Sequence, residues 1–292
     1  MAGSYYHWCC EGLRHDLLFK NTSEYVAGMN RIGVCYLKSL SQDKPVSILA
    51  FCLMSNHFHF VLHGEEEHTG LFVSNYILLT GKWISRHRQE KLHESISPGH
   101  WMAYNPDKLR EKIIYNLRQA VEAGIAVTPQ GYPWCSAPLM FSDKQFIPVF
   151  CRKASEYSLR QIKKMINSET AVPGNWYFLP NGMIWPGCYT SYKQAEKGFR
   201  SVGDFMFMLN NGNVDRSVNE EMMRDKPAIP DTEVKDRAES IAGEFFRRKG
   251  IRTCSAEERV GIARILRKEL HCGYKQLTRV LRMKEEDLRR LV

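Results

Sequence analysis

The chain has 292 residues, of which 43% are hydrophobic and 25% are charged. These fractions are typical of globular proteins and exclude a wholly disordered, fibrous or collagen-like chain. The 41 Lys and Arg residues outnumber the 32 Asp and Glu residues, which gives a net charge of +9. A basic balance of this size favours a polyanionic partner, and nucleic acid is the first candidate.

The cysteines and the most apolar stretch exclude several other classes of protein. The nine cysteines are scattered and form no C-x-x-C pair, so we expect neither a disulfide scaffold nor a cysteine zinc site. The first residues lack the basic and apolar regions of a signal peptide. Residues 45–64 carry no Lys, Arg, Asp or Glu, but His57 and His59 near their middle argue against a membrane span. We therefore expect a protein of the reducing cytoplasm.

The first half of the chain alternates helical patterns with strand-like runs. In chain order, the patterns predict a helix over 25–40, strands over 46–54 and 58–62, and helices over 71–89 and 107–123. Ser55-Asn56 is a turn signal, so the two strands should be adjacent and joined tightly. This order predicts an α+β domain, with one sheet covered by helices, over residues 1–142.

The second half changes character twice. Residues 143–210 predict a small α/β accessory segment, and the Asn-, Gly- and Pro-rich residues 211–235 predict a linker. Residues 236–292 hold 15 Lys or Arg against 9 acidic residues, so they carry +6 of the net +9. Ser255 and Glu258 have capping-box spacing, and further short helices are expected over 274–281 and 284–292. This succession of short helices predicts a basic helical domain that resembles a helix-turn-helix.

His57 and His59 are the first candidates for chemistry. Alternate residues of a strand share one face, so both imidazoles can project together and converge on one divalent cation. The pair alone is a weak signal. With 10 histidines in 292 positions, an H-x-H arises by chance in roughly one such chain in three.

Tyr115 and Gln119 form a second candidate pair, one turn apart on the predicted helix 107–123. A tyrosine hydroxyl is a poor nucleophile at neutral pH because its pKa is about 10, but it becomes useful when a metal polarises the electrophile. The Gln119 carbonyl could complete the coordination of such a metal. The alternative is a half-buried tyrosine beside a solvated glutamine.

The two candidate pairs lie in motifs that resemble those of one family. The run ILAFCLMSNHFHFVL over 48–62 resembles the strand pair of the HUH single-tyrosine transposases, with the REP-associated tyrosine transposases as the nearest branch. The family's helix motif has a counterpart in YNLRQAVEAG over 115–124, followed by YPWCS over 132–136. Ser55 replaces the usual proline, and Gln119-Ala120 replaces Asn-Pro. The resemblance covers roughly residues 5–140.

The resemblance implies a fold and a mechanism. Residues 1–142 would form a ferredoxin-like antiparallel sheet with covering helices, acting on single-stranded DNA next to a hairpin. His57, His59 and Gln119 would hold Mg²⁺ or Mn²⁺ against the scissile phosphate. Tyr115 would attack the phosphorus, leaving a 5′-phosphotyrosine and a free 3′-OH. The protein would then be a DNA endonuclease and strand transferase, either monomeric or a homodimer.

Further residues are weaker candidates for contact with DNA. Asn56 could orient His57 or touch DNA directly. The basic side chains around Tyr115, and those of the last helix, could bind phosphates: Lys108, Lys112, Arg118, Arg289 and Arg290. The last helix opens on acidic residues that would repel phosphate, so reading of double-stranded DNA and protein packing stay equal alternatives for it.

Two other functions fit the same residues. A non-catalytic regulator derived from a transposase would bind DNA through the basic tail without cutting it. A metallohydrolase would use the two histidines without a covalent step.

Overall fold

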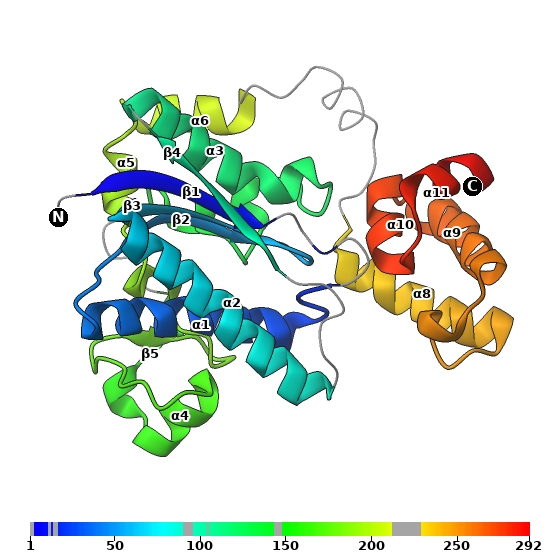
Figure 1. Ribbon diagram of the computed structural model, residues 1–292, viewed down its shortest axis with the longest axis horizontal. Coiled ribbons are helices and arrows are strands. Elements are labelled where there is room, and N and C mark those ends of the chain that lie inside the picture. Colours follow the sequence, from blue (N-terminus) through cyan, green and yellow to red (C-terminus); the bar gives the residue numbers. More distant parts are fainter. Residues whose placement is uncertain are drawn as a thin grey trace.

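The computed structural model describes residues 3–10, 13, 17–89, 96–103, 105–142, 148–211 and 229–292. Described residues up to 211 form one body around a sheet, and residues 229–292 form a separate helical unit (Figure 1). We call these parts the body and the helical unit. The linker predicted over 211–235 lies largely outside the described residues.

The body is organised around a four-stranded sheet in which every neighbouring pair is antiparallel. In the order in which they lie side by side, its strands are β2 (Ser47–Leu53), β3 (Phe58–Gly64), β1 (Ser4–Cys10) and β4 (Pro98–Ala103). The predicted pair of adjacent strands is therefore confirmed, with the bend at Ser55-Asn56 between them. The mixed helix and strand content confirms the α+β class.

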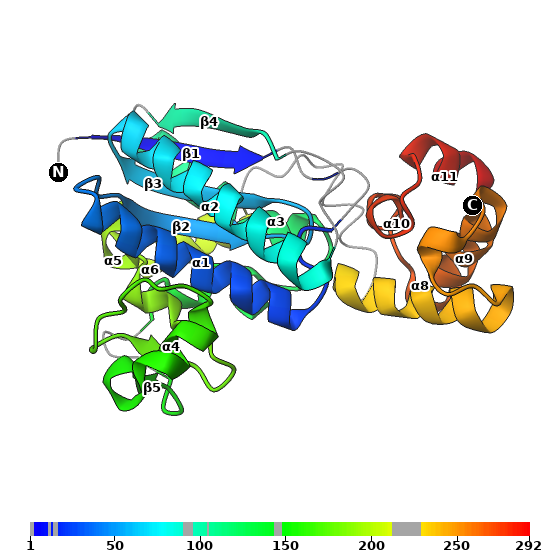
Figure 2. The same ribbon diagram turned by 60° about the horizontal axis from the view of Figure 1, so that its bottom comes forward.

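Helices cover both faces of this sheet (Figures 1 and 2). One face packs against α1 (Thr22–Ser41) and α2 (Glu66–Arg88), and the other packs against α3 (Pro106–Glu122). The helices begin where the sequence supplies caps. The Asn105 side chain accepts a hydrogen bond from Lys108 N at the start of α3, and Pro106 occupies the first turn.

Strand β3 divides its side chains between two cores. Phe58 and Phe60 are buried towards α1 and α2, while Val61 is buried with residues of α3 such as Ile113. Because successive strand residues point to opposite faces, His59 projects with Val61 towards α3. This alternation places a polar imidazole beneath the helix that carries Tyr115.

Strands β1 and β4 were not expected from the sequence. β4 is an edge strand that begins at Pro98-Gly99, and of its residues only Ala103 is buried. β1 lies between β3 and β4, which brings its residue His7 next to the strand that carries His59.

Residues 148–211 complete the body. Their elements are β5 (Arg152–Lys153), α4 (Leu159–Ile166), β6 (Tyr177–Phe178), α5 (Tyr192–Glu196) and α6 (Val202–Asn211). Asn30 of α1 holds this segment, since its Nδ2 donates to the carbonyl oxygens of Met165 (3.1 Å) and Gly182 (3.0 Å). The buried residues of the segment belong to the two cores that flank the sheet.

The helical unit has its own core and contains α8 (Asp231–Phe246), α9 (Ala256–Leu270), α10 (Tyr274–Leu281) and α11 (Glu285–Leu291). The predicted capping box is present, since Ser255 Oγ accepts from Glu258 N and the Glu258 carboxylate accepts from Ser255 N. Helix α8 begins before the expected boundary at residue 236, and Val234 is fully buried in this core. None of the described helices has an apolar stretch long enough to cross a membrane.

Candidate active site

His57 and His59 lie at the end of the hairpin formed by β2 and β3. His59 belongs to β3, whereas His57 precedes the strand by one residue, in a tight turn closed by the hydrogen bond from Met54 N to His57 O (2.8 Å). The two ring centroids are 4.9 Å apart, with the planes 78° to one another. The turn therefore brings the imidazoles together even though only one of them is on the strand.

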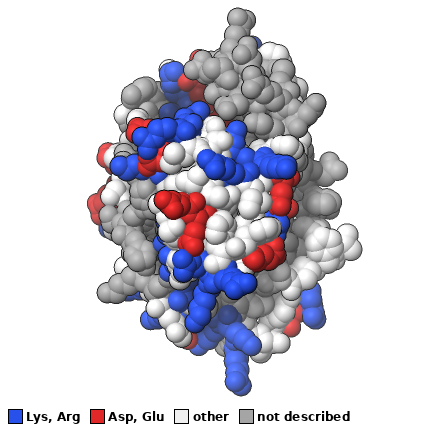
Figure 3. Space-filling view, turned by 90° about the vertical axis from the view of Figure 1, so that its right-hand side faces the viewer, with Lys and Arg blue, Asp and Glu red and all other residues white. Residues whose placement is uncertain are grey.

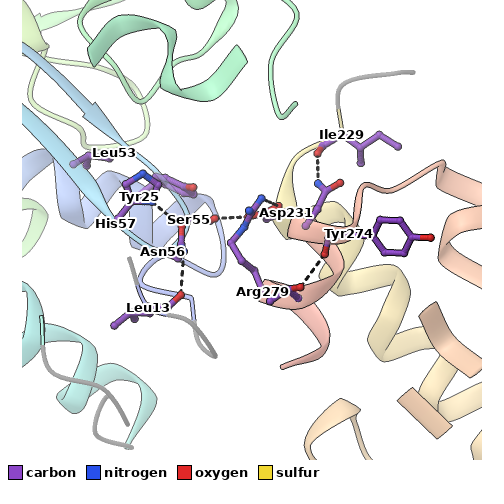
Figure 4. Close-up of polar contacts among 12 residues, drawn as sticks. Leu13, Tyr25, Leu53, Ser55, Asn56, His57, Ile229, Asp231, Tyr274 and Arg279 are labelled. Atoms are coloured by element: carbon purple, nitrogen blue, oxygen red, sulfur yellow. Dashed lines mark hydrogen bonds and ion pairs between the residues drawn. The ribbon is translucent and has the colours of Figure 1, made fainter. Parts of the chain in front are cut away.

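Asn56 fixes the orientation of His57 (Figure 4). The Asn56 Nδ2 donates to the carbonyl oxygen of Leu13 (3.0 Å), which leaves its Oδ1 facing His57 Nδ1 at 2.8 Å. An amide oxygen can only accept, so Nδ1 of His57 carries the ring proton. The other nitrogen, Nε2, is then left with a lone pair to offer.

Tyr115 and Gln119 reach the same place from α3. The Tyr115 ring is 45% exposed and stands edge-on to His59, with centroids 5.7 Å apart and planes at 84°. Gln119 is buried, and its Nε2 donates to the Tyr115 carbonyl oxygen (3.0 Å), so its Oε1 is the free end of the amide. The alternative of a solvated glutamine is therefore wrong, and the four predicted residues line one groove.

His7 is a site residue that the sequence did not single out. It is buried on β1, and its ring lies nearly parallel to that of His59, with centroids 5.3 Å apart and planes 4° apart. Its Nε2 lies 3.2 Å from Nδ1 of His59. Only the register between β1 and β3 places it there, and the one available signal was its alternation with Tyr5 and Cys9 along a strand-like run.

The three imidazoles are neutral at pH 7. Burial, with a smaller effect of the Lys112 charge, lowers the pKa of His7 from 6.5 to about 3. Burial and then the charge of Arg279 lower the pKa of His57 to about 4, although hydrogen bonding to Gln119 acts in the opposite direction. Burial also lowers the pKa of His59 well below 6.5. Neutral imidazole is the form that binds a metal.

The phenol of Tyr115 is protonated at neutral pH. Partial burial raises its pKa above 10, and hydrogen bonding with Gln119 opposes this rise. The ammonium of Lys112 lies 5.8 Å from the centre of the Tyr115 ring and 5.4 Å from that of Trp101. A positive charge thus lies beside the phenol, where an approaching phosphate would meet it.

Arg118 does not lie where a DNA contact would need it. Its side chain is buried, and its Nη1 donates a hydrogen bond to the carbonyl oxygen of Leu209 on α6. Its Nε is 3.4 Å from the Glu122 carboxylate. The predicted contact of Arg118 with phosphate is therefore wrong. Arg118 connects α6 to α3, and its side chain is buried.

The remaining basic candidates are exposed and form ion pairs with nearby carboxylates. Lys108 lies 2.8 Å from Glu111 on α3. On α11, Arg289 pairs with Glu285 at 2.6 Å, and Arg290 lies 3.5 Å from Asp287. Exposed pairs of this kind are weak, so a phosphate can compete for each of these cations.

The predicted donor set could hold a divalent cation. Among the described residues, no three or more His, Cys, Asp or Glu side chains are grouped as metal ligands. The predicted set instead combines two imidazoles with the Gln119 amide oxygen. Nε2 of His59 is buried and has no hydrogen-bond partner among the described atoms, which fits a nitrogen held ready for a ligand. Soft metals prefer sulfur ligands, so a set of two imidazoles and an amide oxygen does not favour a soft metal.

The site opens into a groove of about 790 Å³ between the body and the helical unit. The body contributes the four predicted residues and their neighbours: Cys9, Cys10, Leu13, Asn56, His57, His59, Tyr115 and Gln119. The helical unit contributes the surface that we call the helical wall: Lys275, Thr278, Arg279, Lys284, Glu285 and Glu286. A groove of this volume can admit part of a polymer as well as a metal ion.

One buried carboxylate joins the two parts beside the site (Figure 4). Asp231, the first residue of α8, is 2% exposed and accepts hydrogen bonds from the Ser55 hydroxyl and from Arg279. The Arg279 Nε and Nη2 lie 2.8 and 3.0 Å from the two carboxylate oxygens. Ser55 stands where the resembling family has proline, and its hydroxyl makes this contact with the helical unit.

Comparisons with known proteins add little to this geometry. No protein-family model and no curated protein match the chain. A solved structure of a REP-associated tyrosine transposase bound to a REP hairpin aligns with 48% of this chain and 79% of that one, with 13% identity and a TM-score of 0.35. A similarity this low establishes neither fold nor function. The residues of the site therefore carry the functional conclusion.

Proposed function

We propose that the protein is a metal-dependent enzyme that nicks and rejoins single-stranded DNA next to a hairpin, in the manner of a single-tyrosine transposase. One observation carries the proposal. The half-exposed Tyr115 of α3 meets the buried imidazole of His59 edge-on, and Gln119 lines the same groove. A nucleophile and two kinds of metal ligand thus share one groove.

The topology supports this proposal. The body runs β1-α1-β2-β3-α2-β4, and its strands lie in the order β2-β3-β1-β4. This element order and strand order are consistent with the ferredoxin-like domain that the motif resemblance leads us to expect, and they support the proposal on that basis. In this arrangement His59 lies on the central strand β3, His57 lies in the turn before it, and Tyr115 lies on the helix that follows the last strand.

The proposed chemistry is a transfer between two oxygens on one phosphorus. The phenol oxygen of Tyr115 forms a bond to phosphorus as it loses its proton. The bond to the 3′ oxygen breaks, and that oxygen takes up a proton to become a free 3′-OH. The phosphodiester energy is kept in the 5′-phosphotyrosine, so attack by another 3′-OH rejoins strands without an external energy source.

His57 and His59, through their Nε2 atoms, and Gln119, through Oε1, would hold the divalent ion, which would act as Lewis acid and template at the scissile phosphate. Asn56 keeps His57 in the tautomer that this role requires. Lys112 supplies a fixed positive charge beside the Tyr115 ring, where the phosphate would approach.

The test uses a labelled single-stranded oligonucleotide that contains a hairpin, incubated with the full chain and Mn²⁺. We expect a covalent protein–DNA adduct that survives denaturing electrophoresis, and we expect Tyr115→Phe, His57→Ala or EDTA to abolish it. Tyr36→Phe removes a hydroxyl far from the site and serves as the matched control. Absence of an adduct across a hairpin library, or its persistence in Tyr115→Phe, would contradict the proposal.

The second candidate is a DNA-binding regulator that does not cut. The observation that favours it is the helical wall, whose lysines could hold DNA without any contribution from Tyr115. Binding that keeps its affinity in His57→Ala with EDTA, together with no adduct in the wild type, would establish this function instead. Cleavage that persists in Tyr115→Phe would indicate a metallohydrolase.

A further inference from the structure

The helical unit faces the candidate site with two lysines, and we propose that these bind the DNA strand itself. In this inference Lys275 and Lys284 contact backbone phosphates of the single strand that lies across Tyr115, so that the helical wall is the second side of one binding groove. The inference rests on the proposed function and extends it from the body to the helical unit.

The position of the two lysines is the first support. Lys275 lies in the first turn of α10, and Lys284 immediately precedes α11. Both are exposed, and both line the groove opposite His57 and Tyr115. Neither forms an ion pair with any residue that the structure describes, whereas nearby Arg289 is paired with Glu285. Their ammonium groups are therefore available to an anion in the groove.

The outer surface of the helical unit offers a weaker alternative. Viewed from that side, Lys and Arg are interspersed with Asp and Glu (Figure 3). Several of these cations are paired at short range, such as Arg237 with Glu269 at 2.8 Å and Arg248 with Glu258 at 2.8 Å. Mixed charge of this kind gives little net attraction for DNA, so the unpaired lysines in the groove are the better phosphate ligands.

The helical wall is also held in place. Asp231 is buried and binds Ser55 of the body and Arg279 of α10 at once. The charge of Arg279 is close enough to lower the pKa of His57. Arg279 and His57 line the same groove, so α10 lies at the site, and the ion pair of Arg279 with Asp231 keeps this helix there. Phosphates bound by Lys275 would then lie at a fixed distance from Tyr115.

One acidic residue opposes this binding and provides a second test. Glu285 and Glu286 also line the groove, and Arg289 neutralises the first of them. Glu286 is exposed, and within the described ranges no cation pairs with it. Its charge should repel a phosphate, so Glu286→Gln should tighten DNA binding.

The experiment measures the affinity of the full chain for a labelled hairpin oligonucleotide with an unpaired flank, by fluorescence anisotropy in EDTA. Lys275→Ala/Lys284→Ala should weaken binding about tenfold, and the slope of log K against log salt should fall by roughly 1.4, or about 0.7 for each lost phosphate contact. Lys249→Ala/Lys268→Ala removes the same charge from exposed positions of the helical unit outside the groove. This control should stay within twofold of the wild type.

Equal affinities of the two double variants for the hairpin oligonucleotide would overturn the inference. It would also be overturned if Lys275→Ala/Lys284→Ala lost as much affinity for a blunt duplex without an unpaired flank as for the hairpin oligonucleotide. A Tyr115 adduct that forms normally in that case would leave the proposed function standing. Conversely, a lysine effect without any adduct would reject nicking and keep the binding groove. A wild type that binds no hairpin oligonucleotide would contradict both. Equal thermal unfolding of all variants excludes a folding defect as the cause.

Discussion

The rings of His7 and His59 lie nearly parallel, with their edges towards each other, and Nε2 of the first lies 3.2 Å from Nδ1 of the second. If Nε2 of His59 binds a metal, its Nδ1 must carry the ring proton and donate it to His7. The neighbour on β1 therefore sets the tautomer of His59, as Asn56 does for His57. His7 is on this basis a positioning residue for the candidate metal site.

Replacing His7 should weaken metal binding. His7→Phe fills the space but removes the acceptor for His59, and we expect Mn²⁺ affinity to fall by about 10- to 100-fold. Titration followed by electron paramagnetic resonance measures this affinity without DNA. His63→Phe is the control, since His63 lies on β3 with His59 but at the more exposed end of that strand, and this variant should bind as the wild type does. Unchanged affinity in His7→Phe would reject the positioning role.

Gln119 should act through its oxygen. Gln119→Leu keeps the size of the side chain but offers the metal no oxygen, so the rate of adduct formation at limiting Mn²⁺ should fall roughly tenfold or more. Gln119→Glu restores an oxygen and should recover most of the metal affinity. Single-turnover assays over a range of Mn²⁺ concentrations separate a loss of affinity from a loss of rate. Equal behaviour of the two variants would show that the oxygen does not bind the metal.

Stability should fall as the pH drops below the ordinary pKa of histidine. The pKa of His7 is 6.5 in the unfolded chain and about 3 in the folded protein, so between these values only the unfolded chain takes up the proton. The free energy of unfolding therefore decreases on acidification by about 1.4 kcal/mol per pH unit, or roughly 2 kcal/mol at about pH 5. Urea titrations at about pH 7.5 and about pH 5 measure the difference.

The variant His7→Gln isolates this contribution, because glutamine does not titrate. Its loss of stability over the same pH interval should be smaller than that of the wild type by about 2 kcal/mol. The low pKa values of His57 and His59 act in the same direction and should remain in the variant. An identical pH dependence in both proteins would mean that His7 gains its proton in the folded state.

The hydrogen bond from Ser55 to Asp231 connects the body to the helical unit, and Arg279 of the same unit holds the Asp231 carboxylate in place. Asp231→Ala leaves a largely buried guanidinium without its carboxylate, which costs about 3 kcal/mol. We expect a lower unfolding temperature and faster trypsin cleavage between the two parts. Asp231→Leu/Arg279→Met removes both charges and should be less destabilising than the single variant. If Asp231→Ala lost less stability than Asp231→Leu/Arg279→Met, this account would be contradicted.

Much of the body follows from local sequence. Helix α3 lies within one residue of its predicted bounds because Pro106 opens it and Gly124, with φ of 71°, allows the chain to leave it. The hairpin of β2 and β3 was predictable because a continuous apolar run is followed by the turn signal Ser55-Asn56 and then by a second run of aromatic and β-branched residues. Tyr115 and Gln119 were found because helical spacing puts residues four apart on one face.

What the sequence could not show depends on contacts between distant segments. β4 is exposed over most of its length, so no alternating pattern marks it. Arg118 looks solvent-facing in its helix because its cover, α6, comes some 90 residues later, as the contact with Leu209 shows. Only the pairing of β1 with β3 places His7 beside His59, so no local pattern selects His7 as a site residue. The hydrogen bond between Ser55 and Asp231 likewise joins residues 176 positions apart, which no local pattern marks.

The bond between Ser55 and Asp231 has a practical consequence for anyone who shortens this protein. A fragment that stops at residue 211 would lose the acceptor of the Ser55 hydroxyl, the guanidinium near His57 and one side of the groove. Such a fragment could fold around its own sheet and still give a false negative in a cleavage assay. Truncation at this point removes part of the site as well as an appended domain.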